Sequence, residues 1–62
     1  MKQIVLRAYQ LARSGKCANV EEIQTRLLAE GFHRVSVEED IARPTVLRAD
    51  LAKLCDEAKG KQ

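Results

Sequence analysis

The 62-residue chain contains only two cysteines, one proline, three glycines and no tryptophan. Two cysteines allow at most one internal bridge, which excludes the small scaffolds that depend on many disulfides. No segment approaches the roughly 20 apolar residues that a membrane span needs, so we expect no membrane partner. Met1 leads directly into a helical pattern without a long apolar run, so we expect no secretory leader. These absences favour a cytoplasmic protein with reduced thiols.

The short length limits the size of the core. We expect residues 1–62 to form a single helical domain. A core of this size rarely supplies more than about 3–5 kcal/mol of stability. A dimer interface would enlarge so small a core. The sequence is therefore compatible with a homodimer as well as with a monomer.

Charge is unevenly distributed along the chain, although the net charge is only +2. Residues 1–20 carry four bases and no acid, residues 21–40 carry six acids and two bases, and residues 41–62 carry five bases and three acids. Such asymmetry can steer a charged partner. We favour the simpler explanation that basic and acidic helices face each other within the fold.

Helix stop and start signals alternate along the first half of the chain. Gly15 and Gly31 can adopt the left-handed conformation that ends a helix. Asn19 can cap a helix start, and Glu22 stands where it can reach back to a free backbone N–H group. Phe32 stands where a hydrophobic residue commonly folds back onto the last helical turn. These signals predict one helix before Gly15 and a second between Asn19 and Gly31.

The second half of the chain carries signals for two more helices. Ser36 and Glu39 form a capping box, so a short helix should begin at Val37. It should end near residue 42, because the residue before a proline disfavours the helical region. Pro44 is well tolerated at the first position of a helix. The sequence therefore predicts an all-α fold, a small bundle of three main helices (about 2–13, 20–30 and 44–58) with a short connecting helix (about 37–42).

Apolar residues recur at helical spacing within each predicted helix and give each of them one buried stripe. We expect Leu27, Leu51 and Leu54 to be central in the core. Leu6 lies outside its stripe, and Tyr9 borders it. The inward-facing residues are Ile4, Val5, Ala8, Leu11, Ala12, Val20, Ile23, Leu27, Leu28, Val37, Ile41, Leu47, Leu51, Leu54, Cys55 and Ala58.

No residue pattern is typical of catalysis or of a cofactor site. The spacing of Cys17, Cys55 and His33 matches no zinc motif. His33 follows a helix stop, where a solvated loop residue is expected. Lys16 should lower the pKa of the Cys17 thiol, although an ordinary loop cysteine is the simpler interpretation. A chain this small also has little room to enclose a substrate. We therefore expect no catalytic residue, cofactor, metal or small-molecule substrate.

The stretch Val20–Phe32 has the form V-x-x-I-x-x-x-L-x-x-x-G-F and resembles the second helix of winged helix-turn-helix domains, as in the arginine repressor family. The run Pro44-Thr45-Val46-Leu47-Arg48 is similar to the start of that family's recognition helix. The insertion before this run carries three acids, which repel DNA. The pattern also resembles short bacterial proteins of unknown function. The repressor resemblance implies contacts to the major groove from Thr45 and Arg48, and to phosphates from Arg43 and Lys53.

Two hypotheses for the function follow. The first, which we favour, is a small non-catalytic protein-interaction module, with a homodimer as one form of it. Its contact residues would lie at or beyond the edges of the apolar stripes, at Leu6, Tyr9 and Val46. The second is a helix-turn-helix-like DNA-binding domain in transcriptional regulation, for which a net charge of +2 is low. Its contact residues would be Arg7, Arg13, Lys16, Arg43, Thr45, Arg48 and Lys53.

Overall fold

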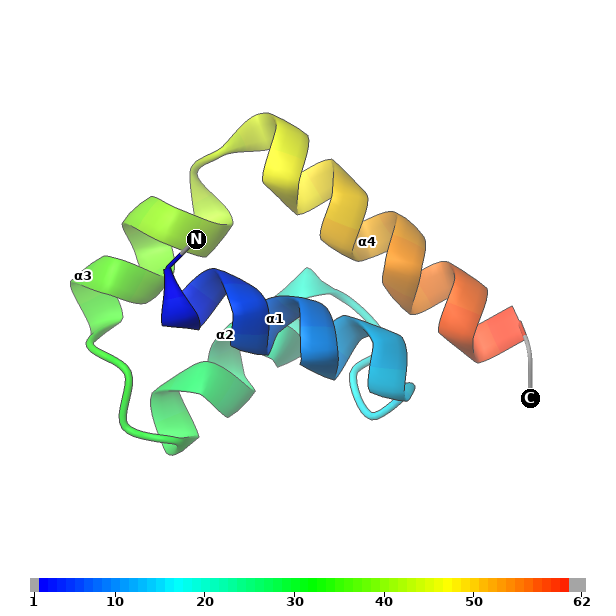
Figure 1. Cartoon of the computed structure of the whole chain (residues 1–62), viewed down its shortest axis with the longest axis horizontal. Helices are drawn as coiled ribbons and strands as arrows, with labels where there is room; N and C mark the ends of the chain where they lie inside the picture. The colour runs from blue at the N-terminus through cyan, green and yellow to red at the C-terminus, as the bar shows by residue number, and fades with distance from the viewer. Residues whose placement is uncertain (1, 61–62) are drawn as a thin grey trace.

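The computed structural model describes residues 2–60 and shows an all-α fold, with no strand in that range. The elements follow one another in the order α1 (Gln3–Ser14), α2 (Val20–Ala29), α3 (Arg34–Val37), η1 (Glu38–Ala42) and α4 (Thr45–Gly60) (Figure 1). The short η1 is a π-helical turn that continues directly from α3. The three main helices match their predicted bounds to within two residues, so the predicted fold class is confirmed.

The central element is α1, which contacts α2, α4 and η1. In Figure 1 it crosses in front of α2, and α4 lies above and to the right of it and runs in the same general direction. The helical segment made by α3 and η1 lies beside the start of α1, where Lys2 Nζ and Asp40 Oδ1 are 3.1 Å apart. This arrangement leaves one long face of α1 uncovered by other elements.

The core lies where α1, α2, η1 and α4 meet. Leu27 and Leu51 are fully buried there, as predicted, whereas Leu54 is only partly buried and packs against the edge of the core. Leu28 was predicted to face inward, but its side chain is 41% exposed because the buried face of α2 passes through Val20, Ile23 and Leu27 instead. The buried apolar residues are Ile4, Ala8, Leu11, Ala12, Cys17, Val20, Ile23, Leu27, Val37, Ile41, Leu51 and Cys55.

Both glycines that were predicted to stop helices adopt positive φ, 78° at Gly15 and 99° at Gly31. After α2 the Gly31 N–H donates to the carbonyl of Leu28, and the Phe32 N–H donates to the carbonyl of Leu27, both at 3.1 Å. This pair of bonds is a Schellman motif, which satisfies carbonyls that the helix end would leave free. The ring of Phe32 is partly buried and packs against the core, as expected.

The start of α2 is also fixed by local hydrogen bonds. Asn19 Oδ1 accepts a hydrogen bond from the Glu22 N–H at 2.9 Å, which confirms the predicted cap. The Glu22 carboxylate reaches back to the N–H of Ala18 at 2.9 Å, one residue before the cap. The loop after α1 is thereby tied to the first turn of α2.

The connecting helix begins earlier than predicted, and the capping box at Ser36 does not form. The cap is His33, whose Nδ1 accepts a hydrogen bond from the Val35 N–H at 3.2 Å. His33 is an exposed loop residue, as expected, and its side chain also caps the start of α3. The predicted capping acceptor was the hydroxyl of Ser36, three residues later. An imidazole nitrogen takes that role instead. The earlier start adds a helical turn before Val37 and leaves Ser36 inside the helix.

The junction with α4 also differs from the prediction. The Arg43 N–H donates to the carbonyl of Glu38, five residues back, at 2.8 Å, and this wider π-helical bond ends the segment. Arg43 keeps helical angles although it precedes a proline. Pro44 stands just before the first helical residue rather than at it, and its carbonyl accepts the first bond of α4, from the Arg48 N–H at 2.9 Å.

Candidate interaction surface

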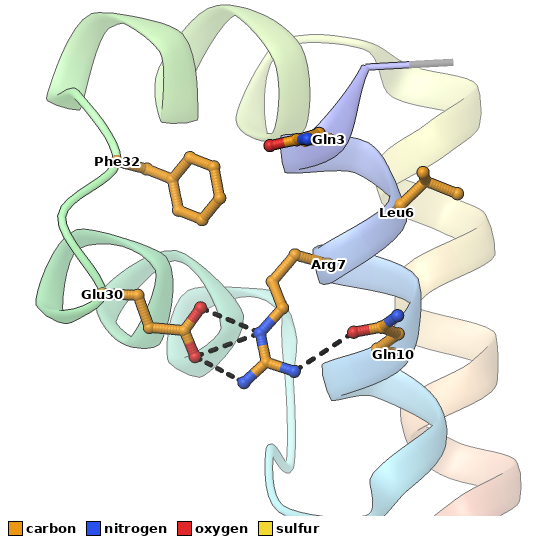
Figure 2. A pocket seen from close by; sticks show the side chains of 6 residues that line it. All are labelled: Gln3, Leu6, Arg7, Gln10, Glu30 and Phe32. Atoms are coloured by element: carbon orange, nitrogen blue, oxygen red, sulfur yellow. Dashed lines mark hydrogen bonds and ion pairs between the residues drawn. The ribbon is translucent and has the colours of Figure 1, made fainter.

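A groove of about 290 Å³ lies between the outward face of α1 and the chain that follows α2. Figure 2 shows the side chains around it, three of which are linked by hydrogen bonds. The lining residues are Gln3, Leu6, Arg7, Gln10, Glu30 and Phe32. We define this set as the α1 groove.

One wall of the α1 groove is an ion pair between α1 and the end of α2. Arg7 Nε donates to Glu30 Oε1 at 2.8 Å, and Arg7 Nη2 donates to Glu30 Oε2 at 2.6 Å. The third nitrogen, Nη1, donates to Gln10 Oε1 at 3.2 Å. Two parallel bonds between a guanidinium and a carboxylate fix the orientation of both groups. The arrangement therefore holds the rim of the groove in a defined geometry.

This ion pair gives a prediction for pH dependence. Hydrogen bonding from Arg7 lowers the pKa of the Glu30 carboxyl group and raises the pKa of the guanidinium. Because the folded-state pKa of Glu30 lies below its unfolded value, the pair stabilises the fold above the unfolded pKa. That contribution is lost as the pH falls through the folded pKa. In Arg7→Gln, we expect the Glu30 pKa to rise toward its ordinary value of about 4.3, as measured by side-chain ¹³C NMR titration.

The matched control for this titration is Arg48→Gln. Arg48 pairs with Glu21, at the opposite end of α2, so its loss should leave the Glu30 titration unchanged. A Glu30 pKa that is the same in wild type and Arg7→Gln would contradict the role assigned to the Arg7 guanidinium.

Leu6 and Phe32 are the apolar residues of the α1 groove, and Leu6 is the more exposed of the two. Its side chain is 47% exposed, and in Figure 2 it projects from α1 away from Phe32. Leu6 cannot turn into the core, because the buried side of α1 is already filled by Ile4, Ala8 and neighbouring residues. A large aliphatic side chain is thus exposed to solvent on a helix whose opposite face is packed against the core.

The other two predicted interface residues lie apart from this groove. Tyr9 is partly buried against the core, and the Arg13 guanidinium carbon lies 5.9 Å from its ring centroid. Val46 is 77% exposed on the first turn of α4. Of the predicted set, only Leu6 lines the α1 groove.

The residues predicted for DNA contact are distributed over several grooves. Thr45 and Arg48 line a groove of about 390 Å³ between the start of α2 and α4. There Arg48 Nη2 lies 3.3 Å from Glu21 Oε1. Arg7 lines the α1 groove, and Arg13 lines a third groove of about 300 Å³ with Leu54, Glu57 and Ala58. Lys16, Arg43 and Lys53 are exposed.

The structure corrects the expectation for Cys17. It is not an open loop thiol beside a cation but a buried core residue, and burial raises its pKa. Arg26 and, to a lesser extent, Arg7 partly oppose this rise by their positive charge, whereas Lys16 is not among its causes. Within residues 2–60, no three His, Cys, Asp or Glu side chains gather in a way that could hold a metal ion. Across the same range, no helix has the length and apolar character needed to cross a membrane.

Sequence reasoning missed most of the α1 groove. Gln3, Gln10 and Glu30 carry no motif, and the partners Arg7 and Glu30 are 23 residues apart, so no local spacing connects them. Leu6, Arg7 and Phe32 were each identified in the sequence, as an interface residue, a DNA-contact residue and a packing residue, but no signal placed the three beside one another. Comparison of the chain with protein-family models, curated proteins and solved structures finds no match.

Proposed function

We propose that this chain is a small non-catalytic protein-interaction module that pairs with a second copy of itself through the α1 groove. The observation that carries the proposal is the exposure of Leu6 beside the fixed Arg7–Glu30 ion pair. Interfaces are typically built from an apolar centre inside a polar rim. Leu6 supplies such a centre. Gln3 and Gln10, about one helical turn to either side of it on α1, supply polar groups of the rim, and the ion pair borders the face on the side toward Phe32.

Two features support a second copy as the partner. Gln3 and Gln10 each carry a donor and an acceptor, so the same face can form hydrogen bonds with itself across a two-fold axis. The core is thin for a stable domain, and burial of Leu6 between two copies would extend it. The geometry thus suits an interface in which each copy offers the same residues to the other.

The test is sedimentation equilibrium over about 10 μM to 1 mM protein, the range for a modest homodimer. We expect a reversible monomer–dimer equilibrium in the wild type. Replacement Leu6→Gln, which keeps the side chain long and helix-compatible, should weaken dimerisation at least tenfold, a loss of about 1.4 kcal/mol or more.

The matched control is Leu28→Gln. Leu28 is 41% exposed, close to the value for Leu6, but it lies on α2 outside the α1 groove. Its replacement should leave the dimerisation constant unchanged. A wild type that stays monomeric at the highest concentration would contradict the proposed self-association. Equal weakening by both replacements would show that Leu6 has no special role.

DNA binding is the alternative function, and the grouping of Thr45 and Arg48 at the start of α4 is what favours it. The pairing of Arg48 with Glu21 weighs against it, because the guanidinium must leave a carboxylate to reach a base edge. Fluorescence anisotropy with mixed-sequence duplex DNA discriminates the two. Binding that survives physiological salt and is lost in Thr45→Ala and Arg48→Ala would replace the interaction proposal.

The cytoplasm is the location that we propose for this activity. Both cysteines are free and lie in the core, which suits a reducing compartment.

A further inference from the structure

The two cysteines, 38 positions apart in the sequence, lie in the same buried core. Cys17 belongs to the loop between α1 and α2 and is 2% exposed, and Cys55 belongs to α4 and is 1% exposed. Both thiols are free. The interaction proposed above uses neither of them, so this pair is a separate feature of the molecule.

The Cys17 loop borders the same groove as the part of α4 that precedes Cys55. The Ala18 N–H bonds to the Glu22 carboxylate at 2.9 Å, which fixes the loop on the first turn of α2. Asn19, next in the chain, lines the same groove as Ala52 of α4. Residues three apart are neighbours on a helix surface, so Ala52 adjoins Cys55. The groove beside the loop therefore extends to the turn of α4 next to Cys55.

Electrostatic effects on the thiols agree with this placement. Burial raises the pKa of Cys55, and the charge of Cys17 is the next largest cause of the rise. Burial also raises the pKa of Cys17, and the positive charge of Arg26 partly opposes that rise. The charge of Cys17 thus acts on the Cys55 thiol, and the positive charge of Arg26 favours the Cys17 thiolate.

We propose that Cys17 and Cys55 form a reversible disulfide that joins the α1–α2 loop to α4. The oxidant class is a low-molecular-weight disulfide such as glutathione disulfide. Since Cys17 lies on a loop and is the residue beside Arg26, it is the thiol that reacts first, during a local opening of that loop.

The reaction consists of two thiol–disulfide exchanges. The Cys17 thiolate attacks one sulfur of glutathione disulfide, forms a mixed disulfide and releases one glutathione thiolate. The Cys55 thiolate then attacks the Cys17 sulfur and releases the second glutathione. The protons lost by the two cysteines pass to the two leaving thiolates. The protein loses two electrons and two protons, and one glutathione disulfide becomes two glutathione molecules.

The bond would restrict the unfolded chain, because it closes a long loop between distant residues. Folding and disulfide formation would therefore be coupled, because a fold that holds both cysteines in one core favours the bond, and the bond favours the fold. The oxidised form should be the more heat-stable one. The thermal stability of the protein would then depend on the redox state of its surroundings.

The test equilibrates the purified protein in buffers of reduced and oxidised glutathione, followed by acid quench, thiol alkylation and mass spectrometry. We expect a monomer that has lost both alkylatable thiols and two hydrogens in mass. The equilibrium constant for bond formation should be at least about tenfold larger in the native protein than in concentrated urea. Its thermal midpoint should rise on the order of 10 °C on oxidation.

Single variants serve as controls. Cys17→Ser and Cys55→Ser each keep one thiol, so both should stop at the mixed glutathione disulfide and show no rise in thermal midpoint. If a serine variant fails to fold, the corresponding alanine variant replaces it. The proposal is overturned if the native wild type yields only mixed disulfides or cross-linked dimers. It is equally overturned if the equilibrium constant is the same in urea as in the native state.

Discussion

Replacement of Leu51 by alanine is expected to lower the free energy of unfolding by about 2–5 kcal/mol. Leu51 is fully buried on α4 and belongs to the core shared by α1, α2 and α4. A core of this size supplies only about 3–5 kcal/mol, so the variant should be partly unfolded without denaturant. Urea titration followed by far-ultraviolet circular dichroism measures the change, because the loss of helix reports unfolding.

The control for Leu51→Ala is Leu54→Ala in the same helix. Leu54 is partly exposed at the edge of the core, so less apolar surface leaves water when the chain folds. Its replacement should cost about 1 kcal/mol. A Leu51→Ala variant with unchanged stability would contradict the position of the buried stripe on α4.

The sequence predicts helix positions well wherever the signal is local. Asn19 caps α2 and Gly31 ends it because each needs only backbone groups within a few residues. The same is true of Gly15 after α1. Such signals act over one helical turn and are readable without knowledge of the fold.

The prediction was wrong where two local signals competed. His33 and Ser36 both offer an acceptor for a helix start, and capping statistics favour serine. The structure uses His33 and gains an additional turn before the buried Val37 and Ile41. The wide π-helical turn that follows contains the buried Ile41 and ends just before Pro44, and no residue pattern in the sequence predicts it.

The candidate site was less predictable than the fold. The exposure of Leu6 follows from its place outside the apolar stripe of α1, which the sequence shows directly. Glu30, by contrast, is assigned to the site only by its contact with Arg7, and that contact depends on how α1 and α2 cross. The burial of Cys17 likewise depends on the path of a loop, which spacing alone does not determine.

The proposed function depends on the position of α1 in the fold. Its buried side contacts α2, α4 and η1, so the backbone that carries Leu6 is held on three sides. Its uncovered side carries Leu6, Gln3 and Gln10 as fixed neighbours. A preformed face of this kind loses little conformational freedom on binding, which favours association through a small contact area.

Replacement of Leu27 by alanine is the second change with a large expected effect, a loss of about 2–5 kcal/mol in the free energy of unfolding. Leu27 is fully buried on α2, and its carbonyl also accepts the hydrogen bond from Phe32 that ends this helix. Loss of the side chain removes core contacts at the point where α2 turns back. Thermal and urea unfolding of the purified variant measure the effect.

The neighbouring residue provides a matched comparison, since Leu28→Ala removes the same atoms from the next position of the same helix. Leu28 is half-exposed, so its replacement should change the free energy of unfolding by no more than about 0.5 kcal/mol. The sequence pattern treats the two leucines as equivalent, whereas the structure separates them. A small effect at Leu27 with a large one at Leu28 would mean that α2 is rotated about its axis. Similar losses at both would support the original sequence-based stripe over the structure.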